Sequence, residues 1–419
     1  MARLPSERGN LGAGGDRPLR VAILIRSLWP GGFARIAIEE SAALNASEPD
    51  RATLIGFATR ENGYRFDDLI RSRGVRVRLV QFRPTFRRVL RRLLLPLVPT
   101  IRDEESSVPL VEIVWWALFN REPYDILLCE DQFVGIAGVV RSVLRSQPYA
   151  LLVAEPISDV EGVRALRVGR NRALARALSR ILYRAESRIL RSARELLFVS
   201  TRTERLVRER FDLRVPPRTA VLHPGCEVDT SPPRAPANPP FLLCASKWDL
   251  GRRPETAIAI ARLTGIRCVL AGSWAARSEE TRFRSKILET IPASGDPPAV
   301  VVTGPIPQGE LDDLFRTAYA YVHWTPEGFA MGVVEALGHG VPVICTSEAG
   351  ASDLLVDGVN GVIVRGTEPE AFVPAIRRLV DEPDLRESLA RGARASAVGL
   401  AWPNHAGRLL HRLRAAVGA

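Results

Sequence analysis

Residues 327–343 read EGFAMGVVEALGHGVPV, and this segment is the most informative one in the chain. It holds two carboxylates, Glu327 and Glu335, with a small-residue turn between them and an apolar helical run after the turn. Gly338-His339-Gly340 then stops the helix, and the apolar residues from Val341 onward predict a buried strand. The first backbone amides of a helix lack partners inside it, and the peptide dipoles add positive potential there. The segment therefore predicts a helix tip that suits a phosphate group, with one carboxylate on each side of it.

Strand and helix patterns alternate on both sides of this stretch, which predicts parallel sheets covered by helices. A proline-dense segment, TSPPRAPANPP, resists regular structure and divides the chain into two series. The expected strands are 20–25, 75–79, 125–129, 149–153 and 195–200 in the first series, and 241–245, 267–271, 300–303, 320–323, 341–345 and 361–364 in the second. We expect α/β architecture with a disordered tail (1–17), a Rossmann-like domain (18–229), a linker (230–240), a second Rossmann-like domain (241–399) and a terminal amphipathic helix (400–419).

Composition bounds the class of protein. A chain of 419 residues with 46% hydrophobic residues is typical of a soluble globular protein with two or more domains. The polar N-terminus lacks the apolar stretch of a signal peptide, and the apolar runs 93–98 and 113–119 are too short to span a bilayer. Five cysteines without CxxC pairing indicate reduced, buried thiols, so we expect a cytoplasmic protein.

The formal net charge is +11, and nearly all of the positive charge is arginine because Lys247 and Lys286 are the only lysines. A GC-rich genome and attraction to an anionic surface both account for this excess. Arg83–Arg102 reads RPTFRRVLRRLLLPLVPTIR and predicts a basic amphipathic helix for the inner face of a membrane. An ordinary surface helix with apolar arginine stems is the alternative. We expect no nucleic acid as a partner, since aromatic platforms and a reading helix are lacking.

Several enzyme classes lack their motifs in this chain. Neither lysine has the glycine before it and the hydroxyl residue after it that a phosphate-binding Walker loop needs. The GxSxG, HExxH and zinc-ligand spacings do not occur. No DxD triad occurs either, so we expect no metal and no cofactor.

The segment 327–343 resembles the Glu-x7-Glu signature of the retaining family-four glycosyltransferases, which have the two-domain GT-B fold. The resemblance implies a nucleotide-sugar domain in the second half of the chain and an acceptor domain in the first. It also implies that Glu335 grips the donor ribose and that Glu327 lies near the donor sugar and phosphates. Around these carboxylates it implies donor contacts from Gly328, Phe329, Ala330, Met331, Gly332 and Val333. The family usually has glycine in place of Ala330, and a methyl group there would crowd the donor if the turn needed a positive φ.

Two further turns resemble the family's phosphate contacts. SKWDLGRRPE (246–255) follows an expected strand and puts Lys247 and Arg252 where the family carries two cations for the donor diphosphate, with the chemical types exchanged. Gly31-Gly32 follows the first strand and resembles the family's Gly-Gly turn against donor phosphate. Solvated surface charge is the alternative for the two cations. Two later strand ends carry further glycines, Gly272 at the expected position of the nucleotide and Gly304 on the next strand. Trp402 and the terminal helix resemble the family's segment that crosses back to the first domain.

Acidic residues follow strands of the first domain. Glu130, Asp131 and Glu155 are expected at the cleft, where they can meet acceptor hydroxyls, although solvated loops explain them as well. The family often carries His-Glu-Pro where this chain has Ala154-Glu155-Pro156, so a helper side chain is missing. His323 ends the strand before Glu327, and we interpret it as a buried core histidine, with a contact to the nucleotide base as the alternative.

The resemblance implies a retaining glycosyltransferase of hexosyl type. Cations and helix-end amides would stabilise the negative charge that grows on the leaving diphosphate of a nucleotide-diphospho-sugar. We expect a glycan or lipid-linked acceptor and a role in surface polysaccharide or glycolipid synthesis. Two alternatives stay open: another GT-B chemistry, such as an epimerase or phosphorylase, and a catalytically silent nucleotide-sugar-binding protein.

Overall fold

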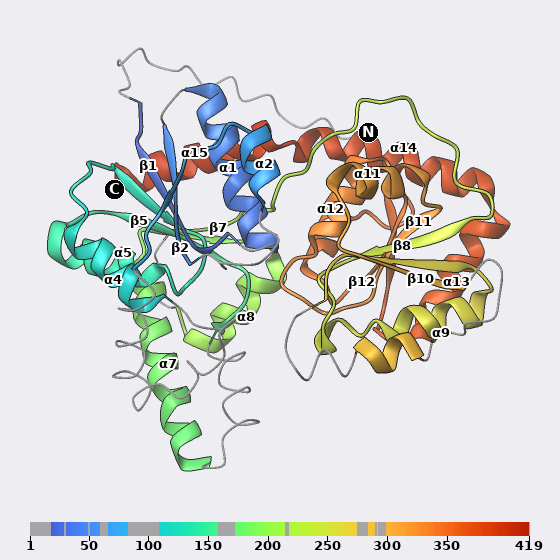
Figure 1. Cartoon of the computed structure of the whole chain (residues 1–419), viewed down its shortest axis with the longest axis horizontal. Helices are drawn as coiled ribbons and strands as arrows, with labels where there is room; N and C mark the ends of the chain where they lie inside the picture. Colours follow the sequence, from blue (N-terminus) through green and yellow to red (C-terminus); the bar gives the residue numbers. More distant parts are fainter. Residues whose placement is uncertain are drawn as a thin grey trace.

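The computed structural model describes residues 18–28, 31–48, 51–58, 66–82, 109–157, 172–213, 218–274, 284–289, 291 and 299–418. Figure 1 shows two α/β domains side by side. The expected tail (1–17) and the basic segment Arg83–Arg102 lie outside the described residues. Each domain is built on a parallel sheet with a hydrophobic core on either face, which confirms the fold class expected from the alternating patterns.

The N-terminal sheet has seven strands in the order β3-β2-β1-β4-β5-β6-β7. Its central strand β1 (Val21–Ser27) alternates its side chains between two cores, so that Ile23 packs in one and Leu24 in the other. The remaining strands are β2 (Ala52–Ala58), β3 (Val77–Leu79), β4 (Ile126–Cys129), β5 (Tyr149–Val153), β6 (Glu195–Phe198) and β7 (Arg218–Val221). The helices of this domain are α1 (Gly32–Ser47), α2 (Asp67–Ser72), α4 (Leu110–Phe119), α5 (Gly135–Arg145), α7 (Arg172–Ser192) and α8 (Thr201–Phe211).

The C-terminal sheet has six strands in the order β10-β9-β8-β11-β12-β13. They are β8 (Phe241–Ala245), β9 (Arg267–Ala271), β10 (Val300–Gly304), β11 (Ala320–His323), β12 (Val343–Thr346) and β13 (Gly361–Val364). The helical elements are η2 (Leu250–Arg252), α9 (Glu255–Thr264), α11 (Gln308–Thr317), α12 (Met331–Gly338), η3 (Gly350–Leu354), α13 (Pro369–Asp381), α14 (Pro383–Leu400) and α15 (Trp402–Val417). The strand order reverses between β8 and β11, and the carboxyl ends of strands at such a point form a crevice for ligands.

The chain passes between the domains twice, and the two passages touch. The Cys226 amide donates to the Leu400 carbonyl at 2.9 Å, and the Trp402 amide donates to the Cys226 carbonyl at 3.3 Å. A Cβ at Gly225 would lie 2.7 Å from the Trp402 ring, so the passages need a glycine there. In Figure 1, α14 and α15 (both red) run along both domains, and α15 ends on the N-terminal one. There α15 packs against α1 and adds Leu409 and Leu413 to the core.

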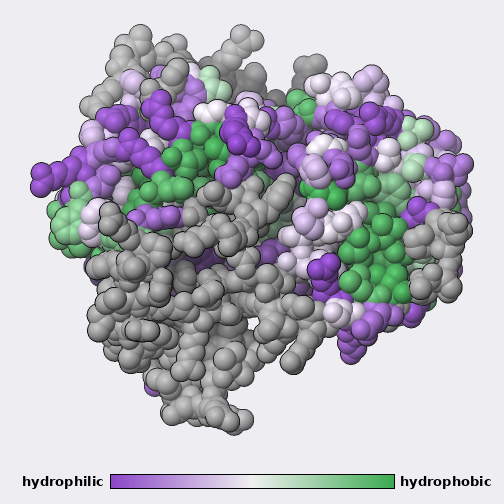
Figure 2. Space-filling model, viewed as in Figure 1, coloured by the Kyte–Doolittle hydropathy of each residue, from purple (hydrophilic) through white to green (hydrophobic). Residues whose placement is uncertain are grey.

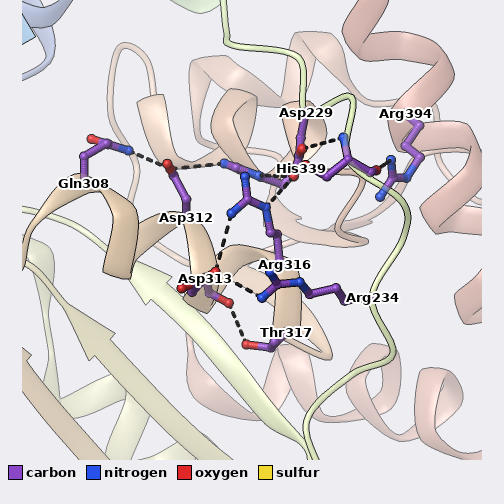
Figure 3. Close-up of polar contacts among 10 residues, drawn as sticks. Asp229, Arg234, Gln308, Asp312, Asp313, Arg316, Thr317, His339 and Arg394 are labelled. Atoms are coloured by element: carbon purple, nitrogen blue, oxygen red, sulfur yellow. Dashed lines mark hydrogen bonds and ion pairs between the residues drawn. The ribbon is translucent and has the colours of Figure 1, made fainter. Parts of the chain in front are cut away.

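A charged network ties the first passage to the C-terminal domain (Figure 3). Asp229 accepts from Arg316 Nε at 2.7 Å and lies 3.2 Å from His339 Nδ1. The other ring nitrogen of His339, Nε2, lies 3.4 Å from Asp312 on α11. Burial lowers the pKa of His339, but its hydrogen bonds to Asp312 and Asp229 outweigh that effect and raise the pKa overall. We call Asp229, Asp312, Arg316 and His339 the hinge network.

Candidate functional site

The tip of α12 faces the N-terminal domain. A Cβ at Gly32 would lie 3.4 Å from Met331 Cγ, so the Gly31-Gly32 turn lies against the first residue of α12. Ala330 caps this helix with φ −99°, which any L-residue adopts, and its methyl group is buried in the core of the domain. The turn therefore has no positive φ at Ala330, and the condition under which a methyl group would crowd the donor is not met.

Glu327 lies just before that tip and has two partners. Its carboxylate forms an ion pair with Arg252, and Oε1 lies 2.9 Å from His323 Nε2. Hydrogen bonds of its backbone amide and carbonyl fix the position of Arg252. Its amide donates to Asp249 Oδ1 at 3.0 Å, and its carbonyl accepts from the Trp324 indole at 3.0 Å. The structure thus brings together the carboxylate and one of the two cations that the sequence singled out.

The imidazole of His323 is neutral. Burial, and then the nearby Arg252 cation, lower its pKa from 6.5 to about 3. Its Nε2 faces two acceptors, Glu327 Oε1 at 2.9 Å and the Thr325 carbonyl at 3.0 Å, so we assign the hydrogen to Nε2. His323 is thus a hydrogen-bonded histidine, 7% exposed, which agrees with the buried interpretation; the same ring supports Glu327.

Glu335 lies one turn into α12 and is paired across the cleft. Its Oε1 lies 2.7 Å from Arg35 Nη1 on α1, and the same nitrogen donates to Gln308 Oε1 at 3.2 Å. Both side chains of the ion pair are mostly shielded, at 14% and 13% exposed for Arg35 and Glu335. Sequence reasoning did not select Arg35 as a site residue, although it stands three positions after the Gly31-Gly32 turn.

The ends of β8, β9 and β10 meet beside these groups. Gly272 has φ +118°, and a Cβ there would clash with the Ser246 carbonyl, so only glycine fits. Its amide donates to the Gly304 carbonyl at 3.1 Å. Lys247 follows Ser246 and is exposed. Of the remaining predicted donor contacts, Val333 is fully buried, so only its backbone can face a ligand, whereas Phe329 is partly buried and packs against the cores of both domains.

The acidic residues of the first domain do not share one surface. Glu130 is fully buried, and desolvation followed by the neighbouring Glu40 raises its pKa well above the usual value. Its expected place at the cleft mouth is therefore wrong. Asp131 is 6% exposed and caps the turn before α5 by accepting from the Val134 amide at 2.9 Å. Glu155 is exposed, and its Oε1 accepts from the Gly328 amide of the other domain at 2.9 Å.

Two features are absent from the described residues, a metal-binding cluster and a membrane-spanning helix. In those ranges no cluster of three or more histidine, cysteine, aspartate or glutamate side chains is arranged to hold a metal ion. Within the same ranges no helix has the length and apolarity to cross a membrane.

The C-terminal half matches a known family. The model described as "Glycosyl transferases group 1" matches residues 234–396, which include both carboxylates and Arg252. Residues 234–396 belong to the glycosyl transferase group 1 family. This confirms the resemblance that the Glu-x7-Glu segment indicated. Curated relatives of this chain include a D-inositol 3-phosphate glycosyltransferase of Streptosporangium roseum, 35% identical over 128 residues, which cover 30% of this chain and 29% of that one. A protein of the same name from Xylanimonas cellulosilytica is 27% identical over 212 residues, which cover 46% and 50% of the two chains.

Solved structures match over both domains. Anabaena HepE in complex with UDP and glucose aligns with a TM-score of 0.69 at 18% identity, covering 94% of this chain and 99% of HepE. Sucrose-phosphate synthase from Thermosynechococcus elongatus aligns with a TM-score of 0.68 at 19% identity, covering 95% and 100%. These matches establish the two-domain GT-B fold. The chain spans less than a third of the length of the first curated relatives that it matches.

Proposed function

We propose that this protein is a retaining glycosyltransferase that transfers a hexosyl-type sugar from a nucleotide-diphospho-sugar to a glycan or lipid-linked acceptor. The observation that carries the proposal is the arrangement at α12, where Glu327 pairs with Arg252 before the helix tip and Glu335 faces the cleft one turn inside it. The group 1 match over these residues supports the same conclusion.

Each group has a role that its position supports. The donor diphosphate lies against the amides at the start of α12, with Arg252 and Lys247 as its cations, and Glu335 accepts hydrogen bonds from the ribose hydroxyls. As the bond between the anomeric carbon and the phosphate oxygen opens, negative charge grows on that oxygen. Fixed cations and amides then stabilise the transition state more than the ground state. Glu327 stays beside the sugar, and Asp131 lies on the acceptor side.

A UDP-sugar is the donor to test first, because solved structures with this fold include HepE complexes with UDP and with UDP-glucose. The purified protein is screened by thermal shift against UDP-, GDP- and ADP-sugars. The sugar that stabilises it is then followed for slow release of nucleoside diphosphate. We expect stabilisation and release with one nucleotide. Binding without any release would indicate a silent nucleotide-sugar-binding protein, and no stabilisation by any donor would refute the proposal.

We also propose that the N-terminal domain binds an anionic membrane from the cytoplasmic side. Adjacent helices α4 and α5 expose large apolar side chains, of which Trp115 is 46%, Phe119 60% and Leu144 60% exposed. Figure 2 shows apolar atoms at its left edge, over these helices. Arg145 of α5 donates to the Leu118 carbonyl of α4 at 2.8 Å, which places a cation beside these side chains, and the net charge of +11 complements anionic lipid. The expected basic segment Arg83–Arg102 ends seven residues before α4 in the sequence.

Vesicle sedimentation tests this surface. We expect the protein to sediment with vesicles of phosphatidylcholine containing a third phosphatidylglycerol, and not with phosphatidylcholine alone. The double variant W115S/F119S should lose most of this binding, because the apolar anchor is removed. V356S/V359S, which changes two exposed valines of the C-terminal domain, is the control and should bind as the wild type does. Equal binding by both double variants would contradict the proposal.

A further inference from the structure

The turn that carries Glu327 is held from two domains. The Glu327 carbonyl accepts from the Gly350 amide of its own domain at 2.8 Å. The other side of the same peptide group, the Gly328 amide, donates to Glu155 Oε1 of the N-terminal domain at 2.9 Å. The next carbonyl, that of Gly328, accepts from Ser200 Oγ of the N-terminal domain at 2.7 Å. Two consecutive peptide groups, on either side of Gly328, are therefore hydrogen-bonded to the N-terminal domain, and these bonds exist only where the two domains are in contact.

The approach is close enough to need glycines. A Cβ on Gly328 would clash with the Ala154 carbonyl, and a Cβ on Gly350 would clash with the Gly328 carbonyl. Ser200 is fully buried, and it also caps α8 by accepting from the Thr203 amide at 3.1 Å. Glu155 is anchored through its own carbonyl, which accepts from Gln132 Nε2 at 2.8 Å. Contacts within the N-terminal domain thus position both Ser200 and Glu155, the two residues that hold the turn.

We infer that Glu155 is a positioning residue that fixes the Glu327 turn when the two domains meet. The carboxylate of Glu155 acts on the protein backbone, through the Gly328 amide, and not on a substrate hydroxyl. When the domains part, this hydrogen bond and that of Ser200 are lost together. Of the three backbone hydrogen bonds described above, the turn then keeps only the one to Gly350, while the Glu327 side chain keeps its contacts to Arg252 and His323. The proposed donor site is therefore complete only in the closed arrangement. The catalytic consequence of this inference rests on the proposed function, whereas the backbone contact does not.

Two variants of Glu155 separate positioning from direct chemistry. Glu155→Ala removes the acceptor, whereas Glu155→Gln keeps a side-chain oxygen that can still accept from the Gly328 amide. Thr201→Ala is the matched control, because Thr201 Oγ1 donates to Asp353 Oδ1 across the same domain boundary at 2.7 Å and touches neither Gly328 nor Glu327. Glu155 is exposed, so its replacement should leave the fold intact.

The first measurement needs no turnover. Hydrogen–deuterium exchange of the peptide spanning 327–331 should quicken about tenfold at Gly328 in Glu155→Ala and stay near the wild-type rate in Glu155→Gln and Thr201→Ala. Unchanged exchange in Glu155→Ala would overturn the inference. This result is independent of whether the protein transfers sugar.

The second measurement is turnover of the donor found in the screen. We expect kcat/KM to fall about tenfold in Glu155→Ala, as one hydrogen bond to a charged group is lost, and to be largely restored in Glu155→Gln. If Glu155→Gln were as impaired as Glu155→Ala, the carboxylate itself would act on substrate and the inference would fail. If the wild type turned over no donor, the proposed function would fail, and the exchange experiment would still decide the role of Glu155.

Discussion

At the scale of single residues, Glu335 joins the two domains through Arg35 and is also proposed to hold the donor ribose. Its partner Arg35 lies 2.7 Å away, and both side chains are largely shielded from water. A ribose that binds Glu335 therefore competes with an existing ion pair.

Replacing Glu335 by alanine should lower donor kcat/KM by about ten- to a hundredfold, the equivalent of one or two hydrogen bonds to a charged group. Steady-state kinetics with the preferred donor measures this. Glu387→Ala, which removes an exposed carboxylate on α14, is the control and should be as active as the wild type. Full activity of Glu335→Ala would show that Glu335 does not hold the donor ribose.

The buried His323 predicts an acid-sensitive fold. Its pKa is lowered to about 3 by burial, whereas in the unfolded chain it is about 6.5. Between these values the unfolded state binds a proton that the folded state does not, so stability falls as the pH drops below about 6.5. Going from pH 7 to pH 5, the wild type should lose about 2 kcal/mol more unfolding free energy than His323→Gln does. Urea denaturation at both pH values measures the difference, and parallel losses would show that His323 is already protonated in the fold.

Sequence reasoning reached some site residues and missed others for one physical reason. Glu327, Glu335 and Arg252 follow strands or flank a helix start, and local pattern alone places such residues near a sheet edge. Arg35 and Ser200 gain their roles only from contact with the other domain, which no local pattern records. The local sequence around Ser200 and Thr203 is typical of a helix cap, in which Ser200 accepts from the Thr203 amide. The same local sequence gives no sign that Ser200 also donates to the Gly328 carbonyl of the other domain. Glu130 misled because a carboxyl after a strand usually faces solvent, whereas here Glu40 lies beside it inside the domain.

At the scale of elements, α12 depends on its close approach to the sheet. A Cβ on Gly332 would clash with the Tyr321 hydroxyl, which belongs to a fully buried ring, and would lie 3.2 Å from the Ala245 carbonyl. Gly332→Ala should therefore destabilise the protein by about 2 kcal/mol, despite the better helix propensity of alanine. Thermal and urea unfolding measure this. Gly407→Ala on α15 has open space around its Cβ and should instead stabilise by up to about 1 kcal/mol.

The elements were predicted best where apolar runs are long and buried. β5, β8 and β11 have the bounds that the sequence predicts. β12 begins at Val343, two residues later than expected, because Pro342 has no amide hydrogen to donate to a sheet ladder. β2 and β7 were not anticipated. β7 is short and partly exposed at the sheet edge, so its sequence carries little of the buried-strand pattern.

At the scale of the whole molecule, the hinge network makes the join between domains depend on pH. Its histidine, His339, has a raised pKa in the folded protein, so the stability that it contributes is fully present below about pH 6.5 and is lost as the pH rises through the folded value. His339→Gln keeps a hydrogen-bonding side chain but no charge, and should cost about 2 kcal/mol near pH 5.5. The cost should shrink toward pH 9.

Unfolding by urea across this pH range measures the difference between the wild type and His339→Gln. His411→Gln, on the exposed side of α15, is the matched control and should show no such trend. A cost that stayed constant from pH 5.5 to pH 9 would mean that the charge of His339 does not hold Asp229 and Asp312.

The packing of α15 on α1 sets an order for biosynthesis. Strands β1 to β7 emerge first from the ribosome, yet part of the core that covers them, including Leu409 and Leu413, lies within residues 402–417. The two cores of the C-terminal domain contain neither Leu409 nor Leu413. This domain can therefore fold before the N-terminal domain has completed its core. During translation the earlier half of the polypeptide would expose an apolar groove until the later half has matured. A nascent chain arrested at about residue 400 should accordingly recruit chaperones through its N-terminal half.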